Sequence, residues 1–256
     1  MDPATLIGVG LAFGAIFASM LIEGGNPAEI LIPQALVLVF GGTFGAAMAG
    51  TMLKDTIDVI NGFKRAFLGK VTPPDALVES IIKLAEKARR EGLLALEDAM
   101  KDVADPFLKK GLQLAIDGTD SEELRDILEA EVDAKRRVDK VGAKFFADMG
   151  GFAPTIGIIG TVLGLINVLK NLSQPAKLGA LIASAFVATL WGVMSANVLW
   201  LPLGNKLKRL SDVECAQMDL VIAGIINIQA GANPRIVAQK LYSLMGGNPD
   251  KKAEAA

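Results

Sequence analysis

Two groups of polar residues in this sequence have types and positions that could support chemistry. Hydroxyl side chains such as Thr161 and Thr189 lie inside long apolar runs, where a polar group is costly unless it faces a partner or a wet path. They could offer oxygen atoms to a passing cation, although Ser and Thr in such helices often bond to carbonyls of their own helix. The second group places both signs of charge close together: Arg89, Arg90, Glu97 and Asp98. This pattern could recognise a charged partner, and it is also typical of an ordinary solvated helix face.

The side chains that are absent exclude several classes of site. The 256 residues contain no histidine, which excludes a histidine-based catalytic triad, a histidine zinc site and a histidine proton shuttle. The single cysteine, Cys215, can form neither a disulfide within the chain nor a metal-binding cluster. No nucleophile is paired with a base and no nucleotide-binding motif occurs, so we expect neither an enzyme nor a bound cofactor. The net charge of −2 argues against a nucleic-acid-binding protein.

The elements that must position the hydroxyl groups are four apolar runs. With 52% hydrophobic residues, a mean hydropathy of +0.43 and yet 21% charged residues, the sequence combines apolar spans with water-facing segments. A helix needs roughly 20 apolar residues to cross a bilayer. Four runs that reach or approach this length contain no Asp, Glu, Lys or Arg: Ala4–Ile22, Ile30–Leu53, Phe152–Leu169 and Leu178–Leu203. Because the chain could bring only hydroxyls to an ion path, the acid of such a path must come from another protein.

The distribution of basic residues predicts the orientation of these runs. Of the 26 Lys and Arg residues, 17 lie between Lys54 and Asp148 and seven lie from Lys206 onward, whereas Glu23–Glu29 has none. The positive-inside rule therefore places the large loop, the tail and both chain ends in the cytoplasm. We predict an all-α integral membrane protein with four transmembrane helices in two hairpins and a large helical cytoplasmic domain. The predicted segments are 1–53 (first hairpin), 54–151 (cytoplasmic domain), 152–205 (second hairpin) and 206–256 (cytoplasmic tail).

Helical periodicity also runs through the cytoplasmic segments. It predicts helices over Asp75–Arg90, Asp105–Ile116, Ser121–Met149, Asp212–Ala230 and Pro234–Leu244. We expect Gly150, Gly151 and Pro154 to break the third of these before the third apolar run. Small residues recur at helical spacing in the apolar runs, as at Gly160 and Gly164, which favours close packing of helix against helix.

Three motifs carry a family resemblance. They are ARREGLLALE at residues 88–97, PTIGIIGTVLGL at residues 154–165 and AFVATLWG at residues 185–192. The first is similar to the cytoplasmic signature of the MotA/PomA family, the A subunit of the bacterial flagellar stator, and the other two resemble its third and fourth spans. The resemblance extends in order from about Asp2 to Leu244 and agrees with the four-span topology.

The resemblance implies partners and an assembly. Members of this family are similar in forming a ring of five A subunits around two single-span B subunits of the MotB/PomB type, which supply an intramembrane Asp and bind peptidoglycan. Ion binding and release at that Asp rotates the ring against the rotor switch protein FliG. The resemblance thus implies an ion-conducting stator subunit of the flagellar motor in the bacterial inner membrane, with H⁺ or Na⁺ as the transported ion.

The same resemblance assigns roles to individual residues. Four charged residues match the positions that meet the rotor: Arg89, Arg90, Glu97 and Asp98. Pro154 and Pro202 match two functionally sensitive prolines near the cytoplasmic ends of the third and fourth spans, where a proline sets a kink or a hinge.

The resemblance also locates the ion path. Thr161 and Thr189 match hydroxyl positions beside the partner's Asp. Sodium-driven members carry Thr at the position of Thr161, where proton-driven members have Ala, so we favour sodium over protons. Ala188 departs from those sodium-driven relatives that have two consecutive threonines at this point.

Other functions remain open at the level of sequence. The TolQ/ExbB-type energising proteins also form a ring of five around partner helices, but they have three spans and lack the Arg-Arg…Leu-Ala-Leu-Glu segment. The first hairpin therefore discriminates them from this chain. A non-conducting membrane scaffold or a membrane enzyme would show no ion conductance, with or without a partner that bears an intramembrane Asp.

Overall fold

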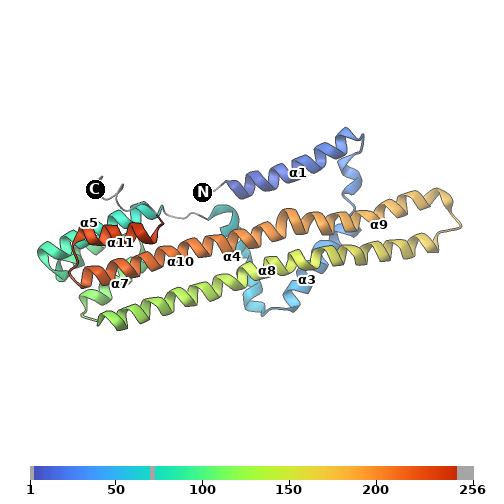
Figure 1. The fold of residues 1–256 in the computed structure, drawn as a ribbon. Helices are drawn as coiled ribbons and strands as arrows, with labels where there is room; N and C mark the ends of the chain where they lie inside the picture. The colour runs from blue at the N-terminus through green and yellow to red at the C-terminus, as the bar shows by residue number, and fades with distance from the viewer. Residues whose placement is uncertain (1–2, 70–72, 247–256) are drawn as a thin grey trace. The chain divides into compact units, whose positions relative to one another are not determined.

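The computed structural model describes residues 3–69 and 73–246, and within these ranges all regular structure is helical (Figure 1). The predicted all-α fold is therefore confirmed for this part of the chain. Three of the predicted segments, 1–53, 54–151 and 206–256, include residues that lie outside the described ranges: 1–2, 70–72 and 247–256.

The chain forms two compact units, each built from two separate stretches of sequence. The first unit contains Met1–Lys70 and Asp139–Leu210, and the second contains Val71–Val138 and Ser211–Ala256. Two long helices, α8 (Ser121–Lys170) and α10 (Leu201–Gln229), contribute residues to both units.

The first unit contains the apolar runs. Its elements, with the adjoining parts of α8 and α10, are α1 (Ala4–Ile22), the 3₁₀ turn η1 (Pro27–Ile30), α2 (Pro33–Leu36), the π turn η2 (Val37–Gly41), α3 (Gly42–Ala49), α4 (Leu53–Leu68), α9 (Pro175–Ser195) and the π turn η5 (Ala196–Trp200). The second half of α8 and α9 lie side by side, joined by a short turn (Figure 1). This helical pair carries the third apolar run and most of the fourth, which ends in η5 and the first residues of α10.

The first two apolar runs differ in how well they match the prediction. α1 begins and ends at the predicted residues; none of its side chains is fully buried, although Phe13 and Phe17 pack against a buried cluster of the first unit. The second run forms a shorter continuous stretch, Pro33–Ala49. Proline at the first position of α2 and the loss of helical geometry at Gly50 set its limits. Within the described residues, three helices are long and apolar enough to cross a membrane: Ala4–Ile22, Ser121–Lys170 and Pro175–Gln229.

The predicted break before the third apolar run is wrong. α8 continues from Ser121 to Lys170 through Gly150, Gly151 and Pro154. In an isolated helix an internal proline costs about 3 kcal/mol and a glycine about 1 kcal/mol. Here the neighbouring turns are anchored by side chains buried in the first unit: Phe145, Phe146, Met149 and Ala153. Tertiary packing therefore holds the helix through residues that end helices elsewhere.

The second unit is a helical bundle around one apolar core. Its elements, with the adjoining parts of α8 and α10, are α5 (Pro74–Glu91), η3 (Leu93–Ala95), α6 (Leu96–Ala99), η4 (Met100–Asp102), α7 (Pro106–Ile116) and α11 (Pro234–Leu244). The core takes buried side chains from six α-helices, among them Ile81, Leu112, Leu128, Ile225 and Leu241.

Three of the helices predicted for this unit are confirmed to within a residue, namely those matched by α5, α7 and α11. The predicted helix Asp212–Ala230 is not separate, because α10 runs without a break from Leu201 to Gln229.

Candidate functional site

A close approach of α8 and α9 sets the geometry around the two predicted ion-path threonines. A Cβ atom added to Gly160 would lie 2.5 Å from the Cβ atom of Ala188. From the other helix, a Cβ atom added to Gly192 would lie 2.6 Å from the carbonyl oxygen of Ala153. These distances leave no room for a larger residue, so the glycines allow the two backbones to meet, as small residues do in membrane helices.

Thr161 in α8 and Thr189 in α9 meet at this contact, where their hydroxyl groups are hydrogen-bonded to one another. The Thr189 hydroxyl lies 3.2 Å from the Gly157 carbonyl oxygen. The Thr161 hydroxyl lies 3.2 Å from the carbonyl oxygen of Ala185 and 3.3 Å from that of Gly157. We call these two hydroxyls and two carbonyls the threonine cluster. Two hydroxyl hydrogens cannot serve all of these acceptors at once, so lone pairs remain on the cluster's oxygens.

The threonine cluster differs from other polar groups of the apolar runs. Thr155, Ser195 and Asn197 each donate to a carbonyl of their own helix, three or four residues back. Thr161 also approaches a carbonyl of its own helix, but both threonines bond across two helices as well, and both side chains are half-buried. Hydroxyl and carbonyl oxygens are ligands that hard cations accept. The cluster can therefore offer oxygens to a cation, but among the described residues no group of three or more His, Cys, Asp or Glu could hold a metal.

Neither predicted hinge proline ends its helix. Pro154 lies inside α8, one turn before Gly157 of the threonine cluster. Pro202 is the second residue of α10 and directly follows the π turn η5. Because proline has no N–H, residue 202 cannot donate to the carbonyl of Val198. π turns are frequent at functional sites, and this one widens the helix where the bond is missing.

The four charged residues lie in the second unit, on a surface turn between two helices. α5 ends at Glu91 because Gly92 adopts a left-handed φ of +87°, which residues with a Cβ atom rarely do. The buried Leu96 then anchors the next helix in the core. We call the exposed residues of this segment the charged turn: Arg89 and Arg90 at the end of α5, and Glu97 and Asp98 in α6.

Asp98 of the charged turn forms an ion pair with Lys101, a residue that sequence analysis did not single out. The Lys101 ammonium donates a 2.8 Å hydrogen bond to the Asp98 carboxylate. This bond, together with the charge of Lys101, holds the pKa of Asp98 below its ordinary value and raises the pKa of Lys101. Both side chains are largely exposed, so solvent screens the pair and its contribution to stability is small. Asp98 keeps its negative charge, with a cation beside it.

Comparison of the sequence with known proteins identifies the family of this chain. Residues 6–92 match the family described as Motility protein A N-terminal, and residues 99–220 match the MotA/TolQ/ExbB proton channel family. Motility protein A of Bacillus subtilis (strain 168) is 38% identical over 94% of this chain and 90% of that protein. The chain belongs to the motility protein A family. Chemotaxis protein PomA of Vibrio alginolyticus, another relative, is 30% identical over 99% of this chain and 98% of that protein.

Two solved structures extend the likeness to three dimensions. A chain of C. jejuni MotAB matches with a TM-score of 0.92 and 32% identity, over 95% of this chain and 96% of that one. A chain of the flagellar MotAB stator complex from Bacillus subtilis matches with a TM-score of 0.89 and 37% identity, over 98% of each chain. The motility protein A resemblance drawn from the motifs is confirmed, and the matched family is one of channel proteins rather than enzymes.

Sequence analysis assigned no role to Trp191, which lies near the threonine cluster. The Trp191 indole donates a 2.6 Å hydrogen bond to the Ile30 carbonyl, and its ring packs against Phe40. Trp191 follows Thr189 by two residues and ties α9 to the second apolar stretch. A buried tryptophan needs an acceptor for its N–H, so a tryptophan within an apolar run already indicates that such a partner exists. The acceptor lies 161 residues away, so no local pattern identifies it.

Proposed function

We propose that the chain is the A subunit of a flagellar stator, which couples inward cation flow to torque on the rotor. The observation that carries this proposal is the likeness of almost the whole chain to the flagellar MotAB stator complex. The likeness covers both units, and hence the helices of the threonine cluster as well as the charged turn.

The subunit lies in the bacterial inner membrane, with four spans in two hairpins and both termini in the cytoplasm. Three helices support this directly by length and composition. The fourth, Pro33–Ala49, rises about 26 Å at 1.5 Å per residue, close to the roughly 30 Å of a bilayer core. The positive-inside rule sets the orientation. Residues 1–53 and 152–205 are then the hairpins, and 54–151 and 206–256 the cytoplasmic parts.

Conduction requires a carboxylate that the threonine cluster does not contain. A single-span subunit of the MotB/PomB type supplies it as an intramembrane Asp, in a complex of the kind represented by the two similar MotAB structures. Five copies of this chain form the ring around that partner. No resident cofactor takes part, since the cation is transported rather than retained.

The transported cation is sodium in this proposal. Thr161 and Thr189 direct a pair of hydroxyls and two carbonyl oxygens to one place, and Na⁺ is a hard cation that needs several oxygen ligands. A proton needs only the partner's acid and water. Pro154 in α8 and Pro202, at the start of α10 where the π turn η5 joins it to α9, serve as the hinges.

Torque passes through the charged turn to the rotor switch protein FliG. Arg89 and Arg90 on one side and Glu97 and Asp98 on the other present both signs of charge on an exposed surface. Complementary charges fix the orientation and register of two surfaces, and they act over a short range at physiological salt.

The TolQ/ExbB-like alternative receives less support. The match of residues 6–92 to the motility protein A N-terminal family covers the first hairpin and the basic end of the charged turn, the parts that distinguish a stator from an energising ring.

The test is to delete the gene in its host, complement it, and record swimming speed against external sodium at a fixed proton motive force. Loss of swimming with sodium-dependent rescue is expected. Normal swimming after deletion would refute the stator proposal. Rescue that is indifferent to sodium would refute only the choice of ion.

A further inference from the structure

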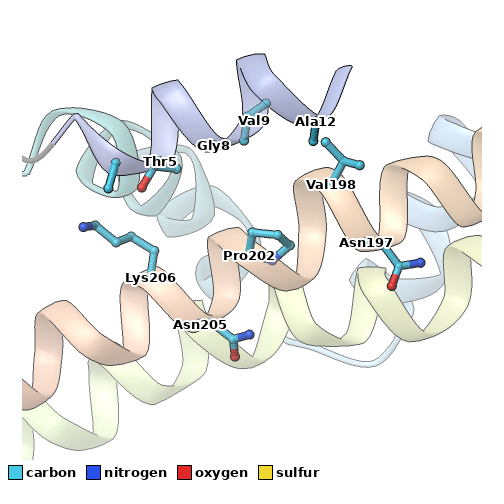
Figure 2. Close-up of a pocket in the computed structure, with 10 residues that line it drawn as sticks. Thr5, Gly8, Val9, Ala12, Asn197, Val198, Pro202, Asn205 and Lys206 are labelled. Atoms are coloured by element: carbon cyan, nitrogen blue, oxygen red, sulfur yellow. The ribbon is translucent and has the colours of Figure 1, made fainter. Parts of the chain in front are cut away.

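A pocket of about 520 Å³ lies within the first unit, between α1 and the start of α10 (Figure 2). α1 contributes Thr5, Gly8 and Ala12 to its wall, and Val198, Pro202 and Lys206 line the opposite side. Its glycine and alanine explain the space, since larger residues on α1 would fill it. Neither the threonine cluster nor the charged turn contributes a residue to this pocket.

The pocket has an apolar body and one cationic end. Val198 and the ring of Pro202 face α1 along its length, and Lys206 extends from α10 toward the first turn of α1, where Thr5 lies (Figure 2). The lining is mostly apolar, and its other polar residues, Asn197 and Asn205, carry no charge. This polarity suits a molecule with a long apolar part and an anionic group at one extremity.

The depth of the pocket corresponds to one leaflet of a bilayer. Eight residues separate Val198 from Lys206, which is about 12 Å along a helix and less than half of a roughly 30 Å core. The cationic end coincides with the predicted cytoplasmic ends of α1 and the fourth span. Basic pockets between membrane helices on the cytoplasmic side bind anionic lipid headgroups, and a lysine stem can lie along apolar surface while its ammonium reaches the headgroup level.

We propose that this pocket binds an anionic phospholipid of the inner leaflet, with an acyl chain along Gly8, Val198 and Pro202 and the phosphate near Lys206. A membrane helix from a second copy of the chain fits less well, because the four apolar runs contain no Asp or Glu that could face Lys206. The inference rests on the membrane placement proposed above, but not on the identity of the ion or on torque.

Two pairs of variants test the site. Gly8→Leu fills the pocket, and Gly10→Leu is its control, because both glycines have open space around a new Cβ atom but only Gly8 lines the pocket. Lys206→Gln removes the cationic end, and Lys208→Gln removes an exposed neighbouring charge that does not line the pocket. Each variant is purified with its partner subunit in nanodiscs of equimolar phosphatidylglycerol and phosphatidylcholine. The lipids that stay bound are counted by native mass spectrometry.

We expect retained phosphatidylglycerol to fall about five-fold in Lys206→Gln and to be lost in Gly8→Leu, with both controls like the parent. Equal retention in parent and variants, or equal loss in variants and controls, would overturn the proposal. A changed subunit number in Gly8→Leu with lipid retained would overturn it in favour of a second copy. Swimming and membrane yield are recorded for the same variants. A chain that fails to enter the membrane contradicts the proposed function, whereas a normal yield without bound lipid contradicts this site alone.

Discussion

At the scale of single residues, Thr161 and Thr189 are distinctive because their hydroxyls bond to each other and not only to their own helices. Each hydroxyl therefore has a fixed position, while both threonine side chains are only half-buried. A cation at this place would receive preorganised oxygens, and a missing hydroxyl would remove one ligand and leave the other without its partner.

Replacing Thr161 with Ala should therefore weaken sodium use. The loss of about 1 kcal/mol, a typical value for one hydrogen-bonding group, corresponds to a roughly five-fold higher sodium concentration at half-maximal swimming speed. Speed is measured against external sodium at fixed proton motive force. Thr161→Ser should keep most of the sodium response, and Thr155→Ala, which removes a hydroxyl bonded within its own helix, should not change it. A sodium response in Thr161→Ala equal to that of the parent would refute a ligand role.

The charged turn gives a second prediction at this scale. Arg89→Glu or Glu97→Lys should reduce swimming at least several-fold while the protein still reaches the membrane, because both side chains are exposed and carry no core contact. Arg125→Glu reverses an exposed charge on α8 of the same unit and serves as the control. Normal swimming after both reversals at the charged turn would exclude it as the torque surface.

At the scale of elements, the α8–α9 contact depends on glycines, because the absence of a side chain lets the two backbones approach closely. Gly192→Ala would place its Cβ atom 2.6 Å from the Ala153 carbonyl oxygen, a backbone atom that cannot rotate away. Overpacking of this kind costs about 1–3 kcal/mol. We expect a lower melting temperature of the purified protein and a weakened threonine cluster. Gly151→Ala in α8 meets open space, and it should be neutral or slightly stabilising. Equal melting of the two variants would show that the close approach does not matter.

Elements that depend on local signals were predictable from the sequence. α1 and α11 match their predicted limits, because uncharged runs and a proline at the first helical position are local features. The continuity of α8 through Pro154 was not predictable from the sequence, because it depends on side chains that are buried only once the first unit has formed. The same holds for the site. Family resemblance pointed to Thr161 and Thr189, but their contact arises from the approach of two helices across 28 residues.

At the scale of the whole molecule, the single chain has exposed apolar surfaces and lacks an intramembrane carboxylate, and both features point to an assembly with other subunits. Apolar side chains along the membrane helices remain exposed in the single chain, among them Ile158, Val162, Phe186 and Val193. Helices with exposed faces of this kind pack against lipid or against other helices. The threonine cluster has hydroxyls but no carboxylate, so the conduction proposed above requires an acid from another protein.

This argument predicts that the chain alone conducts poorly. Purified and reconstituted into sodium-loaded liposomes without a partner, it should form rings of five yet show sodium flux close to that of empty vesicles. Coexpression with a single-span partner bearing an intramembrane Asp should raise the flux, and the Asp→Asn form of that partner should abolish the increase, because the amide cannot carry the negative charge that balances a cation. The Asn partner also controls for leakage caused by assembly itself. Substantial flux through the chain alone would mean that its own oxygens suffice, and the idea of a borrowed acid would then be wrong.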